Sequence, residues 1–174
     1  SDFFRLCGGS LGGKARGLAF ARSMIKQSGI EKEFEDVTIR VPDCAVVGTH
    51  EFDQFMKDNQ LWQKALNIED NKKLERAFKK ARLSIDLILK LESFILDHKN
   101  PLAVRSSSLL EDSQYQPLAG SYKTIMLPNN SRSTKKRLKE LMIAIKSVFA
   151  STFKGEAKSL LDSTGHRIEE EKIA

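Results

Sequence analysis

The stretch PLAVRSSSLLEDSQYQPLAGSYKT, residues 101–124, decides the fold because it holds the clearest strand signals in the chain. Residues 101–107, PLAVRSS, form an apolar run bounded by a proline and by serines, which is the pattern of a buried strand. Residues 121–127, SYKTIML, are a second strand candidate. Since both strands lie between segments of helical periodicity, the sequence predicts an α+β chain.

Helical periodicity surrounds these strands. Residues 60–98 contain no glycine or proline, and their apolar residues recur at helical spacing, so we predict consecutive helices there, one of them capped by Asp70. The strongest helical pattern in the chain consists of Leu138, Leu141, Met142, Ile145, Val148 and Phe149. Residues 154–163 are predicted to add a short helix.

The N-terminal part of the chain is predicted to contain a helix, two strands and a further helix. A glycine-rich turn opens the first helix at about residue 13, and Gly29 closes it after about residue 27. Residues 37–49 are rich in β-branched residues, and Pro42 interrupts them. This pattern predicts a strand, a turn and a second strand. Thr49 is the predicted N-cap of the following helix.

The composition limits the size of the domain and the cellular compartments that fit this chain. The chain has 174 residues, 40% of them hydrophobic, which suffices for one domain or one lobe of a larger one. It has only two cysteines, no secretory signal pattern, and no apolar run near the roughly 18 to 20 residues of a membrane span. We therefore expect a cytoplasmic protein that does not enter a membrane. The sequence starts without methionine, and it becomes apolar after the charged residues RIEEEK. Both features suggest a fragment of a longer chain.

The net charge of +6 arises from 29 Lys and Arg against 23 Asp and Glu, and it suits phosphate-bearing partners. The densest basic segment, residues 131–140, is predicted to open an amphipathic helix as a solvated face. Aromatic residues make up 7% of the chain and none alternates with these cations, which argues against nucleic-acid binding. The alternative of a basic helical interaction or nucleic-acid-binding module would require a basic stripe along one helix and steep salt dependence.

A glycine-rich segment, GGSLGGKARG at residues 8–17, is the first candidate site. Glycines let backbone N–H groups approach an anion, a helix N-terminus favours negative charge, and Lys14 adds a mobile cation. The segment is not a Walker A loop, because no Ser or Thr follows Lys14. The alternative is a flexible leader that ends in a capped helix.

Two further candidate sites lie in residues 101–124. Arg105 ends the first strand, where a rigidly held guanidinium can grip phosphate oxygens; alternatively it pairs with Glu111 or Asp112. Gly120 and Thr124 belong to a polar loop that could cover a triphosphate as a flap, or could simply be a hairpin turn.

Four segments, in this order and spacing, resemble the N-terminal nucleotide-binding region of the phosphoenolpyruvate synthase and pyruvate phosphate dikinase family. They are GGKARGLAFA (12–21), VPDCAVVGTHEFDQFM (41–56), the stretch 101–124, and AIKSVFASTFKGEAKSL (144–160). No single segment is specific, but their joint occurrence is. The resemblance runs from about residue 8 to the end of the chain.

The resemblance implies that residues 1–174 are the N-terminal part of an ATP-grasp ATP-binding domain. Its first lobe would consist of several helices packed on a small, mainly antiparallel sheet. The family's phosphate-contacting lysine falls on Lys14, its strand-end arginine on Arg105, which would also be catalytic, and its flap glycine and threonine on Gly120 and Thr124. ATP is the implied cofactor, and the ligands for Mg²⁺ are expected outside this chain.

The implied activity belongs to a larger enzyme. In the family, the β-phosphoryl group of ATP passes to a histidine on another domain and then to pyruvate, giving phosphoenolpyruvate. None of His50, His98 and His166 lies in a motif like that histidine's, so these are expected to be structural or surface residues. A relative of the same architecture could instead phosphorylate an antibiotic or a glucan. The chain by itself is expected to be inactive and to bind ATP with millimolar affinity or worse.

One departure from the family pattern lies in the flap. Relatives often read Ala-Gly-Gln-Gln-Glu-Thr there, whereas this chain has AGSYKT, so Lys123 replaces an acidic residue. We expect the change to affect nucleotide preference or the behaviour of the flap.

Overall fold

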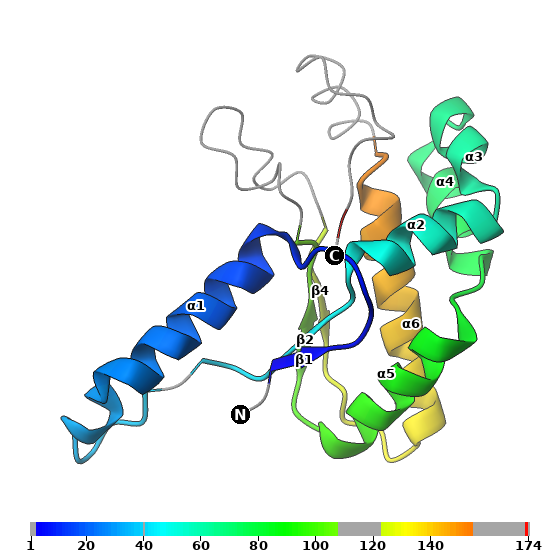
Figure 1. Cartoon of the computed structure of the whole chain (residues 1–174). Coiled ribbons are helices and arrows are strands. Elements are labelled where there is room, and N and C mark those ends of the chain that lie inside the picture. The colour runs from blue at the N-terminus through cyan, green and yellow to red at the C-terminus, as the bar shows by residue number, and fades with distance from the viewer. Residues whose placement is uncertain (1–2, 40, 108–122, 155–172, 174) are drawn as a thin grey trace.

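A computed structural model describes residues 3–39, 41–107, 123–154 and 173 (Figure 1). In this part of the chain, strand β1 (Phe3–Arg5) pairs in parallel with β2 (Cys44–Val46), and β3 (Leu102–Val104) pairs antiparallel with β4 (Ile125–Leu127). The α+β class is thus confirmed. The prediction of a mainly antiparallel sheet is wrong, because the four strands form two separate pairs and one pair is parallel.

The segment 37–49 differs from its prediction. It contains one strand, β2, rather than two, and residues 37–39 are not in a strand. Pro42 cannot donate to a strand ladder, which explains why pairing begins only after it. The partner of β2 is the N-terminal strand β1, whose parallel pairing with a segment forty residues away leaves no local signal in the sequence.

The helical body consists of α2 (Thr49–Asp58), α3 (Leu61–Asn67), α4 (Asn71–Lys80), α5 (Ile85–Asp97) and α6 (Thr134–Ser151). The predicted consecutive helices between residues 60 and 98 are therefore confirmed. The carboxylate of Asp70 accepts hydrogen bonds from two backbone N–H groups of α4, as predicted for its N-cap. The N-cap of α2, however, is Gly48, and Thr49 is the first helical residue.

An aromatic cluster fills the centre of this body. Phe52 is fully buried, and its ring lies 5.2 Å from that of Phe149 and 6.2 Å from that of Phe153, measured between centroids. Phe55 and Phe78 extend the cluster toward α4. Each such ring contributes about 1.5–3 kcal/mol through burial, so this cluster holds the helices together.

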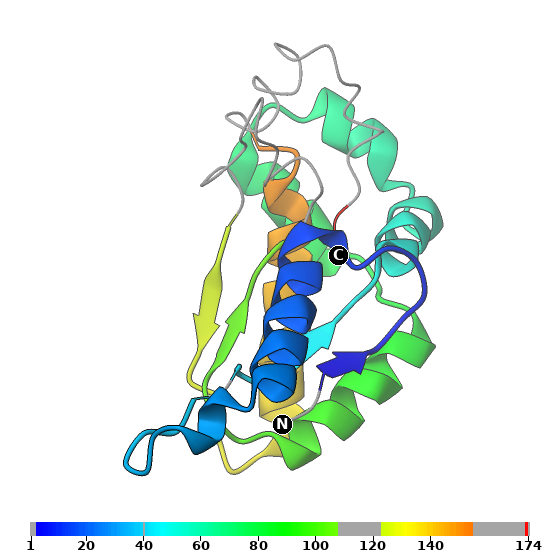
Figure 2. The same ribbon diagram turned by 60° about the vertical axis from the view of Figure 1, so that its left-hand side comes forward.

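Helix α6 is the central element, since it packs on α4, α5 and both strands of the second sheet (Figure 2). The helix predicted from the apolar repeat of 138–149 is confirmed. The prediction that residues 131–140 form a solvated face is wrong at Arg137, which is only 4% exposed. The helix predicted over 154–163 lies outside the described residues.

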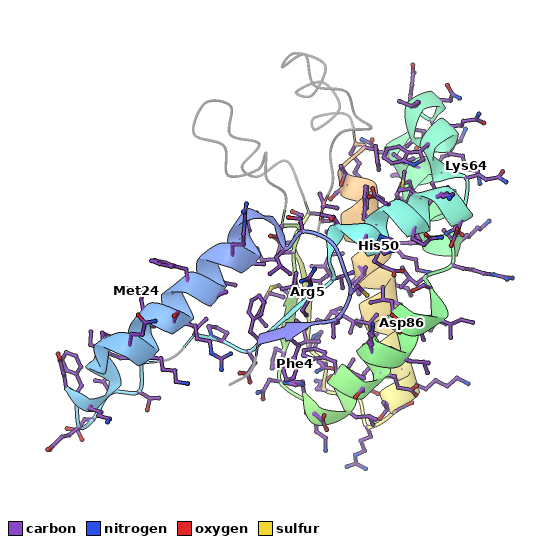
Figure 3. The ribbon with its side chains drawn as sticks, in the orientation of Figure 1. Phe4, Arg5, Met24, His50, Lys64 and Asp86 are labelled. Carbon is purple, nitrogen blue, oxygen red and sulfur yellow. The ribbon has the colours of Figure 1, made fainter. Side chains whose placement is uncertain are left out.

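Helix α1 (Gly12–Ser28) confirms the prediction for residues 13–27, and its C-cap Gly29 has a φ of 69°. It is followed by a short 3-10 helix, η1 (Ile30–Lys32). Only Gly12 and Ala15 of α1 are buried, so the helix touches the body with its first turn and then projects away from it (Figure 1). Met24, beyond that turn, is about half exposed (Figure 3).

Candidate functional site

The glycine-rich loop is docked on the first turn of α2. The carbonyls of Gly8 and Ser10 accept hydrogen bonds from the N–H groups of His50 and Thr49, at 3.3 and 3.1 Å. The N–H of Ser10 donates to the hydroxyl of Thr49 at 2.9 Å. Gly9 has a φ of +97°, and a Cβ there would lie 2.5 Å from the His50 nitrogen. The loop therefore supplies the acceptors that the free N–H groups of α2 need.

A second close approach joins α1 to the segment that follows β3. Gly12 has a φ of +70°, and a Cβ at this position would lie 1.8 Å from the carbonyl oxygen of Ser107. The Ser107 hydroxyl donates to the carbonyl of Leu11 at 3.0 Å and accepts from the N–H of Ala15 at 3.2 Å. Only glycine permits this contact, which fixes the start of α1 against the end of β3.

This junction brings Lys14 and Arg105 to one cavity. The Lys14 ammonium group reaches the carbonyl of Ser106 at 3.5 Å, directly beyond Arg105. Both side chains line a cavity of about 500 Å³ between α1, the strands β2 and β3, and α6. Two cations that are 91 positions apart in the chain therefore line the same cavity.

Arg105 is exposed and makes no hydrogen bond or ion pair with any residue that the structure describes. Within the described residues, nothing occupies the five N–H donors of this guanidinium. Its alternative partners, Glu111 and Asp112, lie outside the described residues. Lys14 is half-buried and has protein partners, so a ligand would share or replace them.

The walls of the cavity are mostly apolar. They include residues of β2, β3 and α6, and one acidic residue, Asp43, which has partners of its own. Cys44 also lines the cavity, and burial raises the pKa of its thiol, which is therefore protonated at neutral pH. An apolar cavity with two cations suits a ligand that has an aromatic ring and an anionic group.

The structure places the flap residues only in part. Thr124 is exposed, precedes β4, and is not among the residues that line the cavity. In the antiparallel register Val104 is opposite Ile125, so the next position along the pair sets Thr124 opposite Arg105. Thr124 thus lies at the same end of the second sheet as the strand-end arginine. Gly120 lies outside the described residues.

Lys123, at the C-terminal end of the predicted flap, is attached to the helical body. Its N–H donates to the Ser151 hydroxyl at 3.1 Å, and its ammonium group lies 3.6 Å from the Glu75 carboxylate. Burial by itself would raise the pKa of Glu75, but hydrogen bonds from Lys154 and Lys79 and attraction to Lys123 lower it to about 2. The lysine that departs from the family pattern therefore joins an ion-pair network on α4.

The two histidines that the structure describes, His50 and His98, do not line the cavity. His50 is exposed in the first turn of α2 (Figure 3), and His98 is half-buried with its ring stacked on Phe94 at 4.2 Å between centroids. His166 lies outside the described residues. Among the residues that the structure describes, no group of three His, Cys, Asp or Glu side chains could hold a metal ion. No helix in the same part of the chain combines the length and apolar character that a membrane span needs.

Two residues that matter for this geometry were not predicted as part of the site. Ser107 joins α1 to β3, and Glu75 anchors Lys123. The serines after Arg105 carried a signal, because a serine hydroxyl often caps a helix. Glu75 carried none, since an acidic residue on an amphipathic helix is usually solvated.

One of three comparisons with known proteins identifies the family of this chain. The family model "Pyruvate phosphate dikinase, AMP/ATP-binding domain" matches residues 9–174. The match spans nearly the whole chain, so the chain belongs to this family, and the resemblance found in the sequence is confirmed. A search of curated proteins and a search of solved structures each found no match.

Proposed function

We propose that this chain is the first lobe of an ATP-grasp nucleotide-binding domain, with Lys14 and Arg105 contacting the phosphate groups of ATP. The observation that carries the proposal is that both cations line one cavity, in a chain of the AMP/ATP-binding family. The apolar walls suit the adenine ring, and the cations suit the phosphates.

The flap completes this proposal. Gly120 and Thr124 would close over the phosphates, and the register of β3 and β4 sets Thr124 beside the end of the strand that carries Arg105. The attachment of Lys123 to Glu75 and Ser151 would fix the C-terminal end of the flap while its glycine moves. Arg105 would have the additional catalytic role of stabilising charge on the transferred phosphoryl group.

In the parent enzyme, the phosphoryl group would pass from ATP to a histidine of another domain and from there to pyruvate, forming phosphoenolpyruvate. The remaining domains, which would bind pyruvate and supply the ligands for Mg²⁺, are the proposed partners. An antibiotic or a glucan would replace pyruvate in a relative of the same architecture. This lobe would catalyse nothing by itself.

Titration of the ¹⁵N-labelled chain with ATP tests the proposal. We expect weak, saturable shifts of the backbone N–H signals of Ala15, Ser106 and Ser107, with a dissociation constant in the millimolar range or above, because the second lobe is needed for tight binding. Arg105→Gln should weaken binding about tenfold, since each charge-assisted contact contributes about 1.5–3 kcal/mol.

Lys57→Gln is the matched control, because Lys57 is an exposed lysine on α2 and does not line the cavity. Its affinity for ATP should equal that of the unchanged chain. A micromolar dissociation constant would refute the requirement for a second lobe. Equal binding by Arg105→Gln and Lys57→Gln would refute the phosphate site.

A further inference from the structure

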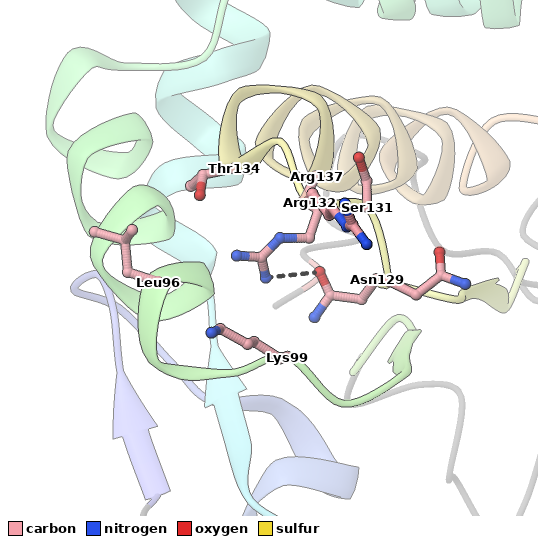
Figure 4. Close-up of a pocket in the computed structure, with 8 residues that line it drawn as sticks. Leu96, Lys99, Asn129, Ser131, Arg132, Thr134 and Arg137 are labelled. Atoms are coloured by element: carbon pink, nitrogen blue, oxygen red, sulfur yellow. Dashed lines mark hydrogen bonds between the residues drawn. The ribbon is translucent and has the colours of Figure 1, made fainter.

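A second cavity lies at the N-terminal end of α6, and its lining shares no residue with the Lys14 and Arg105 cavity. It has a volume of about 550 Å³, and its lining includes three cations, Lys99, Arg132 and Arg137, and no acidic residue (Figure 4). Lys99 precedes β3 whereas Arg105 follows it, so these two cations lie at opposite ends of that strand.

Arg137 is the buried part of this cluster. One of its guanidinium nitrogens, Nη1, donates to the carbonyls of Ile95 and His98, at 2.7 and 3.2 Å, and to the Asn129 side-chain oxygen at 3.3 Å. The other two nitrogens, Nε and Nη2, make no hydrogen bond with a described residue. Neither nitrogen is fully buried, because within the described part of the chain Thr152 Oγ1 is the one buried side-chain polar atom without a partner, and Arg137 lines the cavity.

A purely structural role explains only part of this arrangement. A cation near the C-terminus of α5 stabilises the free carbonyls there, which accounts for the contacts of Nη1. It does not account for the donors of Nε and Nη2 that face the cavity between Thr134 and Lys99 (Figure 4). Nor does it account for two more cations around the same space.

The other groups around the cavity are also unneutralised. Lys99 and Arg132 are exposed and make no ion pair or hydrogen bond with a described residue. The first turn of α6 adds two N–H groups, those of Thr134 and Lys135, which have no acceptor in the described part of the chain. The three cations and Thr134 line the cavity, and the lining includes no acidic side chain.

We propose that this cavity binds a phosphate-bearing small molecule, with a diphosphate or a higher phosphate as the best match. A guanidinium fork and a helix N-terminus both donate in geometries that match phosphate oxygens, and a compact anion of several charges would neutralise the cluster. A volume of about 550 Å³ accommodates a small molecule rather than an extended chain. The proposal does not depend on the nucleotide site proposed above.

The test is a titration of the ¹⁵N-labelled 174-residue chain with sodium pyrophosphate, against sodium chloride of equal ionic strength. We expect saturable shifts of the N–H signals of Thr134 and Lys135 with pyrophosphate only. The double variant Lys99→Gln with Arg132→Gln should bind at least tenfold more weakly, because it loses two charge-assisted contacts. Arg137 stays unchanged, since its Nη1 contacts hold α5.

Two controls make the result specific. The double variant Lys57→Gln with Lys64→Gln removes the same charge from exposed lysines on α2 and α3. Lys64 points away from the body (Figure 3). This variant should bind pyrophosphate like the unchanged chain. Arg105→Gln should leave the shifts at Thr134 unchanged, which separates this cavity from the proposed nucleotide site. Shifts that do not saturate, or equal weakening in both double variants, would overturn the proposal. So would tighter binding of a hexaglutamate peptide than of pyrophosphate at these signals.

Discussion

The helical body and the α1 junction are held together in different ways. In the body, Phe52, Phe55, Phe78, Phe149 and Phe153 form a continuous aromatic cluster. The junction consists of one close backbone approach, at Gly12, and a few polar contacts around the Ser107 hydroxyl. Hydrophobic burial therefore determines the stability of the body. Backbone geometry at the junction determines whether Lys14 and Arg105, the two candidate phosphate-binding residues, line the same cavity.

The largest effect is expected in the aromatic cluster. Phe52→Ala should lower the free energy of unfolding by about 3–5 kcal/mol, because it leaves a cavity among rings that cannot collapse fully. Urea denaturation of the chain measures this loss. The matched control is Phe20→Ala on α1, where the side chain is 67% exposed and the change should cost less than about 0.5 kcal/mol. Equal costs would mean that α1 is packed as firmly as the body.

At the junction we expect a smaller effect on stability but a larger effect on ATP binding. Gly12→Ala should separate α1 from Ser107, because the added Cβ meets a backbone carbonyl at 1.8 Å and no side-chain rotation can relieve the contact. ATP binding, followed by the N–H signals of Ser106 and Ser107, should weaken about tenfold or more, since one charge-assisted contact with the ligand is lost.

Gly17→Ala is the control for this change. Gly17 lies in the same helix, has no atom within 4 Å of an added Cβ, and should gain up to about 1 kcal/mol in helix stability. Equal ATP binding by Gly12→Ala and Gly17→Ala would show that the close approach does not control the site.

The smallest effect is expected in the ion-pair network of Glu75. The pKa of this carboxyl is lowered to about 2 from an ordinary 4.5, so its contribution is complete above pH 4.5 and is lost as the pH falls toward 2. Glu75→Gln should cost about 1–2 kcal/mol at pH 7 and progressively less as the pH falls through 2, with allowance for solvent screening. Urea denaturation at a series of pH values would show this convergence, and parallel curves for the two proteins would contradict it.

The body could be predicted from the sequence much further than the junction. Apolar periodicity identified α6 and the helices between residues 60 and 98, because local spacing determines which face of a helix is buried. The parallel pair of β1 and β2 was missed, since its partners are distant in the chain and each strand has three residues. The burial of Arg137 was also missed, because its carbonyl partners at the end of α5 are visible only in three dimensions.

The candidate site shows the same division. The type and order of its residues indicated Lys14 and Arg105, but only the structure shows that Gly12 and Ser107 bring them together. The phosphate role of these two cations, and that of Gly120 and Thr124, stays a prediction.

A double-mutant cycle of Lys14→Gln and Arg105→Gln, measured by ATP titration, tests most directly whether the two cations hold one ligand. Each change should weaken binding about tenfold. The double variant should bind more tightly than independent losses would give, because two groups on one phosphate chain are coupled by about 0.5 kcal/mol or more. Losses that simply add, or a single change without effect, would contradict the account.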